Sequence, residues 1–225
     1  LKELEDFIKP GISTMDIDKF VEDTIRAHGM IPAFKGYGGF PGSACVSVNE
    51  EVVHGIPSKK RILKEGDIVS VDIGCIYKGY NSDACRTYGV GKISEEAQRL
   101  IDAARESFFE GLKYAREGYR VSDIGAAVQA YVEANGFSVV REFVGHGIGR
   151  NLHESPDVPN YGTEGRGTRL CAGMTLAIEP MVNAGTQEVR VLQDGWTVVT
   201  LDGKLSAHYE NTILVTDGEP EIMTL

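Results

Sequence analysis

The sequence predicts an α+β domain built from two related halves, in which an antiparallel sheet carries helices on its outer face. Two observations lead to this prediction. An apolar strand pattern that ends in a carboxylate occupies 66–72 and recurs at 173–179, which is an offset of 107 in the numbering. The same offset relates 11–29 to 118–136, where a helical pattern is repeated position by position. Because helices then come in pairs and strands in groups, an antiparallel sheet is favoured over a doubly wound parallel sheet.

Helical periodicity predicts helices at 15–28, 94–117 and 122–135. Ser94 and Ser122 are the expected N-caps, because a serine hydroxyl accepts a hydrogen bond from a free amide of the first turn. Gly29 and Gly136 are the expected stops, because glycine readily adopts the left-handed conformation that ends many helices.

Strands are expected where short apolar or alternating runs are rich in β-branched residues. These runs lie at 44–49, 67–76, 84–90, 175–181, 197–200 and 205–215. The Gly- and Pro-rich stretches 35–42 and 155–167 are expected loops. Since no low-complexity linker divides the chain, residues 1–225 are expected to form a single domain with halves at roughly 1–92 and 93–225.

The repeat places four acids in corresponding positions. Asp72 and Glu179 end the two repeated strand patterns. Asp83 and Glu210 each lie 8 residues before a glycine, at an offset of 127, so the second half is expected to hold about 20 further residues between its two acids. A duplicated unit that brings acids from each copy to one place is a natural way to build a site for two metal ions.

A histidine is expected to repeat as well. His54 and His146 each precede Gly-Ile, at an offset of 92. The fall in offset from 107 to 92 requires an insertion of 15 before the first histidine, within 31–48, and another of 15 after the second, within 148–172. Each half is therefore predicted to supply one histidine and two carboxylates.

Composition excludes several classes of function. The 225 residues are 42% hydrophobic and 25% charged, as in ordinary globular proteins, and no stretch is apolar enough to span a membrane. The net charge of −10 argues against a nucleic-acid partner. The four cysteines lack CxxC spacing, which favours reduced, buried thiols and a cytoplasmic location. Leu1 stands inside a helical pattern, so a short leader is expected before it.

The metal site is predicted from five potential ligands. They are Asp72, Asp83, His146, Glu179 and Glu210. Four acids and one imidazole suit divalent Mn, Fe, Co or Zn better than a thiolate site does. The alternative is that the acids are solvated turn or strand-end residues. The apolar residues around Asp72 argue against that alternative, because a carboxylate buried in such a strand needs a partner.

The histidines are expected to have different roles. His54 and His153 are better candidates for catalytic donors than for ligands, since an imidazole near the site can hold a developing oxyanion. His146 stands between glycines, which leave its ring clear of neighbours. His208 lies two residues before Glu210, and its role stays open.

Short motifs occur along essentially the whole chain, at 49–57, 66–72, 81–83, 145–150, 153–154, 175–180, 194–197 and 206–212. Together these motifs closely resemble the signature of type I methionine aminopeptidases. The resemblance implies a pita-bread fold, a centre of two divalent ions, and removal of the initiator methionine when the second residue is small. No insertion of about sixty residues separates His146 from Glu179, so the resemblance is to type I rather than type II.

The resemblance also implies a role for each ligand. Asp72 would chelate one ion, His146 and Glu179 would complete the shell of the other, and Asp83 and Glu210 would bridge both. Glu179 is also the candidate for moving the proton of the attacking water. His54 and His153 would contact the peptide at the scissile bond and stabilise the tetrahedral intermediate.

A methionine pocket is implied by the same resemblance. Tyr37, Phe40, Cys45 and Trp196 match positions that line it, and an apolar, aromatic pocket with a nearby sulfur suits a thioether. Ordinary core packing is the alternative for these residues. Leu152 stands where an aromatic residue is often found, and His208 where many relatives have another residue.

Two rival functions remain open at this point. One is another pita-bread peptidase, such as a prolidase or aminopeptidase P, and the other is a non-catalytic binding module on the same fold. We expect the partners to be peptides with N-terminal methionine and nascent chains at the ribosome, with no nucleic acid and no membrane, and we expect a monomer.

Overall fold

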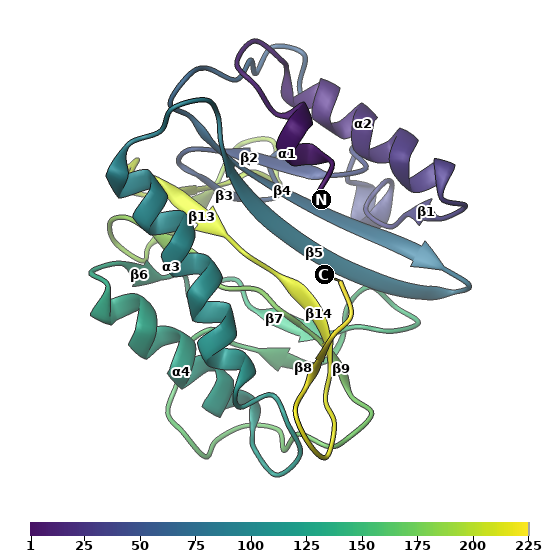
Figure 1. Cartoon of the computed structure of the whole chain (residues 1–225), viewed down its shortest axis with the longest axis vertical. Helices are drawn as coiled ribbons and strands as arrows, with labels where there is room; N and C mark the ends of the chain where they lie inside the picture. The colour runs from purple at the N-terminus through teal and green to yellow at the C-terminus, as the bar shows by residue number, and fades with distance from the viewer. Residues whose placement is uncertain (225) are drawn as a thin grey trace.

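The computed structural model describes residues 1–224 (Figure 1). Its helices are α1 (Leu4–Phe7), α2 (Thr14–Ala27), α3 (Glu95–Leu112) and α4 (Val121–Ala134), with a 3-10 turn at Tyr37–Gly39. The strands of the first half are β1 (Ile31–Pro32), β2 (Cys45–Val48), β3 (Glu51–Val53), β4 (Ile68–Tyr77) and β5 (Tyr80–Gly89). Those of the second half are β6 (Ser138–Val139), β7 (Gly145–Gly147), β8 (Glu154–Val158), β9 (Thr175–Ile178), β10 (Met181–Asn183), β11 (Val189–Val191), β12 (Val198–Thr200), β13 (Ser206–His208), β14 (Asn211–Leu214) and β15 (Glu221–Ile222).

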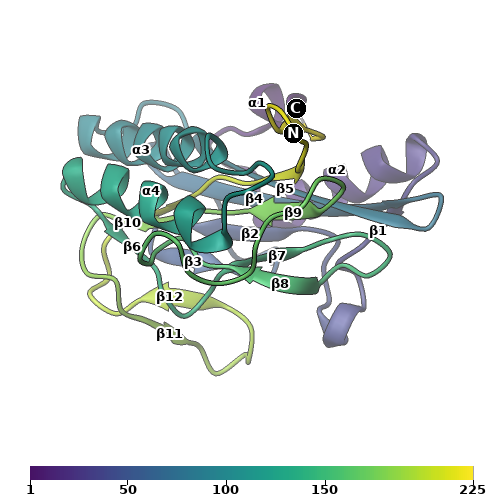
Figure 2. The same cartoon turned by 90° about the horizontal axis from the view of Figure 1, so that it is seen from below.

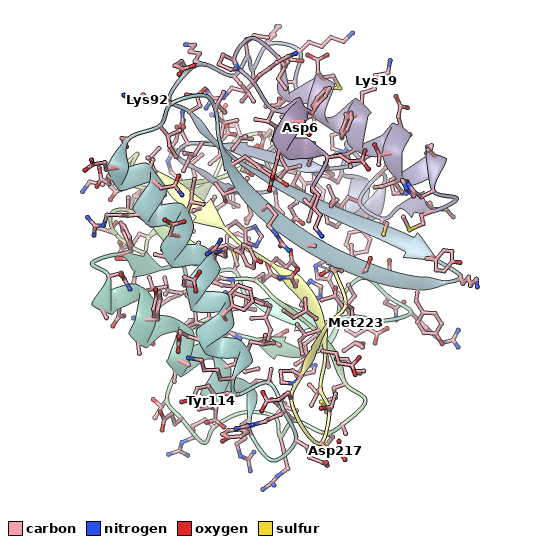
Figure 3. The ribbon with its side chains drawn as sticks, viewed as in Figure 1. Asp6, Lys19, Lys92, Tyr114, Asp217 and Met223 are labelled. Atoms are coloured by element: carbon pink, nitrogen blue, oxygen red, sulfur yellow. The ribbon has the colours of Figure 1, made fainter. Side chains whose placement is uncertain are left out.

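The helices cover one face of the strands, as the sequence predicts. Figure 2 shows α1, α2, α3 and α4 above the strands, whereas β11 and β12 lie on the opposite side. Each strand pair within residues 1–224 is antiparallel. Figure 3 shows Lys19 projecting outward from α2 and Tyr114 at the end of α3. The helices described in residues 1–224 include none that is long and apolar enough to cross a membrane.

Strand pairing confirms the offset of 107 at the outer edge of each half. Pro32 on β1 pairs with Cys75 on β4, and Val139 on β6 pairs with Val182 on β10. Each member of the second pair is numbered 107 above its counterpart in the first. The matching helices bury matching side chains, because Ile17 on α2 and Ile124 on α4 are both 0% exposed. The repeated apolar pattern is therefore a repeated core.

Helix ends are matched too, although one expected cap is wrong. The carboxylate of Asp16 accepts the amide of Ser13 at 2.8 Å, and the carboxylate of Asp123 accepts the amide of Arg120 at 2.8 Å. Helix α4 therefore begins one residue earlier than expected, and Ser122 bonds the loop residue Arg166 instead of capping. Ser122 is not needed as the N-cap, because the acid at the third helical position, Asp123, accepts the free backbone amide at the start of the helix.

The histidine correspondence predicted from the sequence is wrong. In β2–β4, Ser47 pairs with Ser70, and in β7–β9, His146 pairs with Ala177, which is the counterpart of Ser70 at the offset of 107. The counterpart of His146 is therefore Ser47, at an offset of 99. The same offset aligns His54 with His153, and each is followed three residues later by a proline.

The glycines that follow His54 and His146 suggest a repeat, but each is required by local packing. A Cβ on Gly55 would lie 2.3 Å from the carbonyl oxygen of Val46, and one on Gly147 would lie 2.4 Å from that of Ser155. Both glycines permit a close backbone crossing, so the shared His-Gly reflects local packing rather than repeat position. The insertion before β2 is consequently shorter than expected, because the offset falls only from 107 to 99, and it lies in the loop that holds Tyr37 and Phe40.

The two halves meet along a seam between β5 and the β13–β14 segment. Cys85 and Glu210 exchange backbone hydrogen bonds of 3.3 and 3.0 Å. The amide and carbonyl of Asp83 both bond the hydroxyl of Thr212 at 2.9 Å. The offset of 127 carries Asp83 onto Glu210 and Cys85 onto Thr212, so one contact maps onto the other. A pseudo-twofold axis therefore passes between Asp83 and Glu210.

Several strands, one loop and one cysteine differ from what the sequence predicts. The second half breaks its long strands beside an acid, since Glu179-Pro180 separates β9 from β10 and Tyr209-Glu210 separates β13 from β14. Strand β8 occupies the start of the expected loop 155–167. The thiol of Cys171 is exposed rather than buried. The segment added before Glu210 contains β11 and β12, and β12 pairs back onto β3 of the first half.

Candidate metal centre and active site

The structure brings the five expected ligands to one cavity of about 210 Å³. They come from separate segments: Asp72 from β4, Asp83 from β5, His146 from β7, Glu179 directly after β9, and Glu210 between β13 and β14. The cavity is also lined by Phe34, Tyr37, Phe40, Cys45, Val53, His54, Phe143, Val144, Leu152, His153, Met181 and Trp196. Both halves thus contribute acids to the same space.

Burial makes these acids hard to ionise without a cation. It raises the pKa of Asp72 to about 7, although the carboxyl groups of Asp83 and Glu210 oppose this through hydrogen bonds. Burial, followed by repulsion from neighbouring acids, raises the pKa of Asp83, Glu179 and Glu210 well above the ordinary carboxyl range. Such a group of acids calls for a positive partner.

Orphaned oxygen atoms show that the cluster fits a metal ion. Oδ1 of Asp72, Oδ1 of Asp83 and Oε1 of Glu210 are buried without a hydrogen-bond partner among residues 1–224. One ligand atom from each of Asp83, His146 and Glu210 lies within 4.8 Å of the others. Buried polar atoms are nearly always paired, so these oxygens point to a cation bound among carboxylate and imidazole ligands.

The ring of His146 is oriented for such a role. Its Nδ1 lies 2.8 Å from the carbonyl oxygen of Gly147, which leaves Nε2 directed toward Glu179 Oε1 at 3.5 Å. Burial lowers the pKa of His146 to about 4, so its imidazole is neutral at pH 7. A carbonyl that fixes the proton on one nitrogen leaves the lone pair of the other free for a metal.

Removing divalent metal is expected to destabilise the protein increasingly as the pH rises. The folded chain keeps a proton on Asp72 up to about pH 7, whereas the unfolded chain loses it near pH 4. This contribution to the free energy of unfolding is complete below pH ~4 and is lost as the pH rises through ~7. The buried histidines, with lowered pKa, oppose this trend only below their ordinary pKa of 6.5.

Thermal melting in EDTA between about pH 6.5 and pH 8 provides the measurement. The melting temperature should fall across this window, and metal-loaded protein should melt higher with a flatter pH dependence. A metal-free melting temperature that stays constant or rises would contradict the picture of acids crowded without a cation.

His54 and His153 both line the cavity. His54 has a left-handed backbone (φ 58°), which is rare for a residue with a side chain. Its ring makes edge contacts with Phe143 at 5.6 Å and Trp196 at 6.3 Å between centroids. Burial lowers its pKa to about 4, so the ring is neutral.

His153 is held by two neighbours. Its Nδ1 lies 2.8 Å from the hydroxyl of Tyr37, with the two rings stacked at 5.3 Å. Its other face packs against His146, with centroids 4.2 Å apart. Tyr37 is 46% exposed, so it forms the rim of the cavity and not its floor.

The expected pocket residues all border the cavity, and the sequence reading missed others. Phe40 meets Trp196 edge to face at 5.2 Å, and Cys45 is buried opposite Asp72 in the β2–β4 ladder. Burial and the nearby acids raise the pKa of Cys45, so its thiol stays neutral. Phe34, Phe143 and Met181 also line the cavity, and nothing in their local sequence shows that the fold brings them there.

His208 is the least explained residue of the centre. It is 2% exposed, and burial lowers its pKa to about 3. Its Nε2 lies 3.7 Å from Glu179 Oε2, on the other side of that carboxylate from His146. His208 also borders a larger hollow of about 710 Å³ on the helix-bearing side, lined by residues of α2 and α3. That hollow is bordered by Asp83 but by none of the other four expected ligands, whereas all five line the smaller cavity.

Comparison with known proteins agrees with this geometry. The sequence profile of metallopeptidase family M24 matches residues 1–217. A methionine aminopeptidase of Clostridium acetobutylicum is 57% identical over 225 residues, which cover all of this chain and 90% of that protein.

Solved structures give the same result. A methionine aminopeptidase from Thermotoga maritima has a TM-score of 0.98 and 49% identity, covering 100% of this chain and 90% of that one. An Xaa-Pro dipeptidase from Bacillus anthracis has a TM-score of 0.75 and 25% identity, and the match covers 99% of this chain but only 56% of that one. Because the family profile spans nearly its whole length, this chain belongs to metallopeptidase family M24, and its fold is the pita-bread fold of the methionine aminopeptidases.

Proposed function

We propose that this protein is a metal-dependent aminopeptidase that removes an N-terminal methionine when the second residue is small. One observation carries the proposal. A cluster of buried acids with unpartnered oxygens opens directly into a small cavity walled by aromatic side chains and a thiol. Relatives that share about half of its residues are named methionine aminopeptidases.

The acids and His146 would hold two divalent ions. Asp72 would bind one ion, His146 and Glu179 the other, and the seam acids Asp83 and Glu210 would lie between both. When bound, the ions would polarise the scissile carbonyl and lower the pKa of water. The unpartnered oxygens of Asp72, Asp83 and Glu210 support this assignment, because each is buried and free to accept a cation.

The chain's own groups would divide the remaining work. Glu179 borders the cavity with Oε1 3.5 Å from His146 Nε2, so its carboxylate can accept a proton from water held at the metal centre. His54 and His153 are neutral and border the same cavity, so each can donate an N–H to a peptide oxygen that gains negative charge. The contact with Tyr37 holds the plane of the His153 ring.

The aromatic side of the cavity would receive the methionine side chain. Phe34, Phe40 and Trp196 offer apolar edges, and Cys45 adds a soft sulfur. An unbranched, polarizable thioether fits such a space better than a charged or β-branched side chain does.

Peptide cleavage assays would test this specificity. We expect Met-Ala-Ser and Met-Gly-Met-Met to be cut, and Met-Lys peptides to be cut poorly, because the two histidines would crowd a large second residue. Leu-Ala peptides should be weak but detectable substrates, because apolar fit alone discriminates by only about 10–200-fold. N-acetyl-Met peptides should resist cleavage, since the reaction needs a free α-amine near the metal centre.

The same assay separates the rival functions. Efficient cleavage of the acetylated peptide would remove the aminopeptidase assignment. A preference for X-Pro bonds would place the protein with the Xaa-Pro peptidases. Metal binding without cleavage of any peptide would favour a binding module.

The biological setting is part of the proposal. We propose that residues 1–225 act as a single catalytic unit, as a monomer in the cytoplasm, on nascent chains leaving the ribosome. The absence of a membrane-crossing helix among residues 1–224 is compatible with this setting. Gel filtration with light scattering would measure the oligomeric state.

A further inference from the structure

The carboxylate of Glu179 lies between two imidazoles. His146 Nε2 is 3.5 Å from Oε1, and His208 Nε2 is 3.7 Å from Oε2. Only His146 belongs to the cluster of potential ligands whose donor atoms lie within 4.8 Å of one another in residues 1–224. The function assigned above to Glu179 thus engages one side of its carboxylate and leaves the other side facing His208.

The main chain of His208 is fixed on both sides. His208 pairs with Met181 in the β10–β13 ladder. On its other side its amide donates to the hydroxyl of Thr87 at 2.9 Å, and that hydroxyl donates to its carbonyl at 2.8 Å. The backbone that carries the imidazole is therefore held in place, with Nε2 3.7 Å from Glu179 Oε2.

The imidazole of His208 is an unusual group to bury there. Its Nε2 has no hydrogen-bond partner within residues 1–224. A buried polar nitrogen without a partner destabilises the fold, and it persists where it serves another group. Oε2 of Glu179 lies 3.7 Å from this nitrogen, slightly beyond hydrogen-bond distance. A small rotation of either side chain would close the contact.

We propose that His208 is a positioning residue for Glu179. Its ring donates Nε2–H to Oε2, which fixes the plane of the carboxylate and directs Oε1 toward His146 and the metal centre. The inference rests on the proposed metal centre, but not on the identity of the peptide substrate. It follows the general pattern in which ligating carboxylates are held by a hydrogen-bond donor behind them.

Two other roles predict different behaviour. If His208 is itself a ligand, its removal should lower the number of ions bound. If it only fills space, then shape and not the N–H should decide the effect of a substitution. Metal titration distinguishes these roles without any peptide, so failure of the inference can be told apart from failure of the proposed aminopeptidase activity.

The test compares His208→Gln, which keeps an N–H donor of similar reach, with His208→Leu, which keeps bulk and removes the donor. Isothermal titration with Mn²⁺ and with Co²⁺ should show affinity weakened about 10–100-fold in His208→Leu and nearly unchanged in His208→Gln, with the number of ions unchanged in both. The visible absorption spectrum of the Co²⁺-loaded protein should change in the leucine variant and stay close to the parent in the glutamine variant.

Ser206→Ala is the matched control on the same strand. Ser206 is 2% exposed and its hydroxyl bonds the carbonyl of Val182, so this variant tests general damage to β13. It should bind metal like the parent. Circular dichroism would establish that each variant is folded, and a misfolded leucine variant would be replaced by His208→Met.

The inference is overturned by any of three results. The donor-free variant binds metal with parental affinity and spectrum, the glutamine variant is as impaired as the leucine variant, or one equivalent of metal is lost in both. The second result would make the residue a space filler, and the third would make it a ligand.

Discussion

Replacing Asp83 by Asn or Glu210 by Gln is expected to abolish peptide cleavage while leaving the fold intact. Each acid comes from a different half, and the two face one another across the seam with buried, unpartnered oxygens. The amide keeps the shape of the side chain but removes the charge that would hold two cations. Losing several kcal/mol of charge stabilisation corresponds to a fall in kcat of about a thousandfold or more.

Measured kcat with Met-Ala-Ser, together with metal content, would test this expectation. Asp217→Asn removes one exposed acid and serves as the control, which should cleave like the parent. In EDTA at neutral pH, either seam variant should melt above the parent, because one buried acid has been removed from the cluster. A variant that keeps substantial activity and binds two equivalents of metal would show that its acid does not lie between the ions.

His54→Ala and His153→Ala are each expected to lower kcat by about 10²–10³-fold, as for the loss of an oxyanion donor. Both rings border the cavity, and neither is among the five proposed ligands. Metal content should therefore match the parent in both variants. Steady-state kinetics with parallel metal analysis would measure the two effects separately.

His28→Ala is the control for the histidine variants. His28 lies at the end of α2 and bonds the carbonyl of Thr24, so it should not affect turnover. Loss of metal in the His54 or His153 variant would make that residue a ligand. Unchanged kcat would remove it from the reaction.

Strand patterns predicted the positions of the acids well. Asp72 and Glu179 each end a run of apolar residues, and such a run predicts a buried strand. A carboxylate at the end of a buried strand needs a partner. The expected strand 67–76 is β4 almost residue for residue, because five of its ten residues are the β-branched Ile or Val. Where Pro180 removes an amide donor, the expected strand 175–181 is divided into two.

Contacts between distant loops could not be predicted in this way. Phe34 packs against Gly74 of β4 and Phe143 against His54, which are contacts between segments far apart in the sequence that no local periodicity encodes. The pairing of His54 with His146 failed for a related reason. Two glycines needed for close backbone crossings resembled a repeat, and only the strand register showed that Ser47 is the counterpart of His146.

Two of the segments that interrupt the repeat also carry walls of the pocket. The segment added before β2 falls in the loop with Tyr37 and Phe40, and the segment added before Glu210 carries Trp196. The four acids follow the twofold repeat, whereas Tyr37, Phe40 and Trp196, which would contact the methionine side chain, lie in segments outside it. Selectivity and bond cleavage would therefore reside on separately variable stretches of the chain. Exchanging these two loops between homologous enzymes should transfer preference for the first amino acid without disturbing the catalytic apparatus.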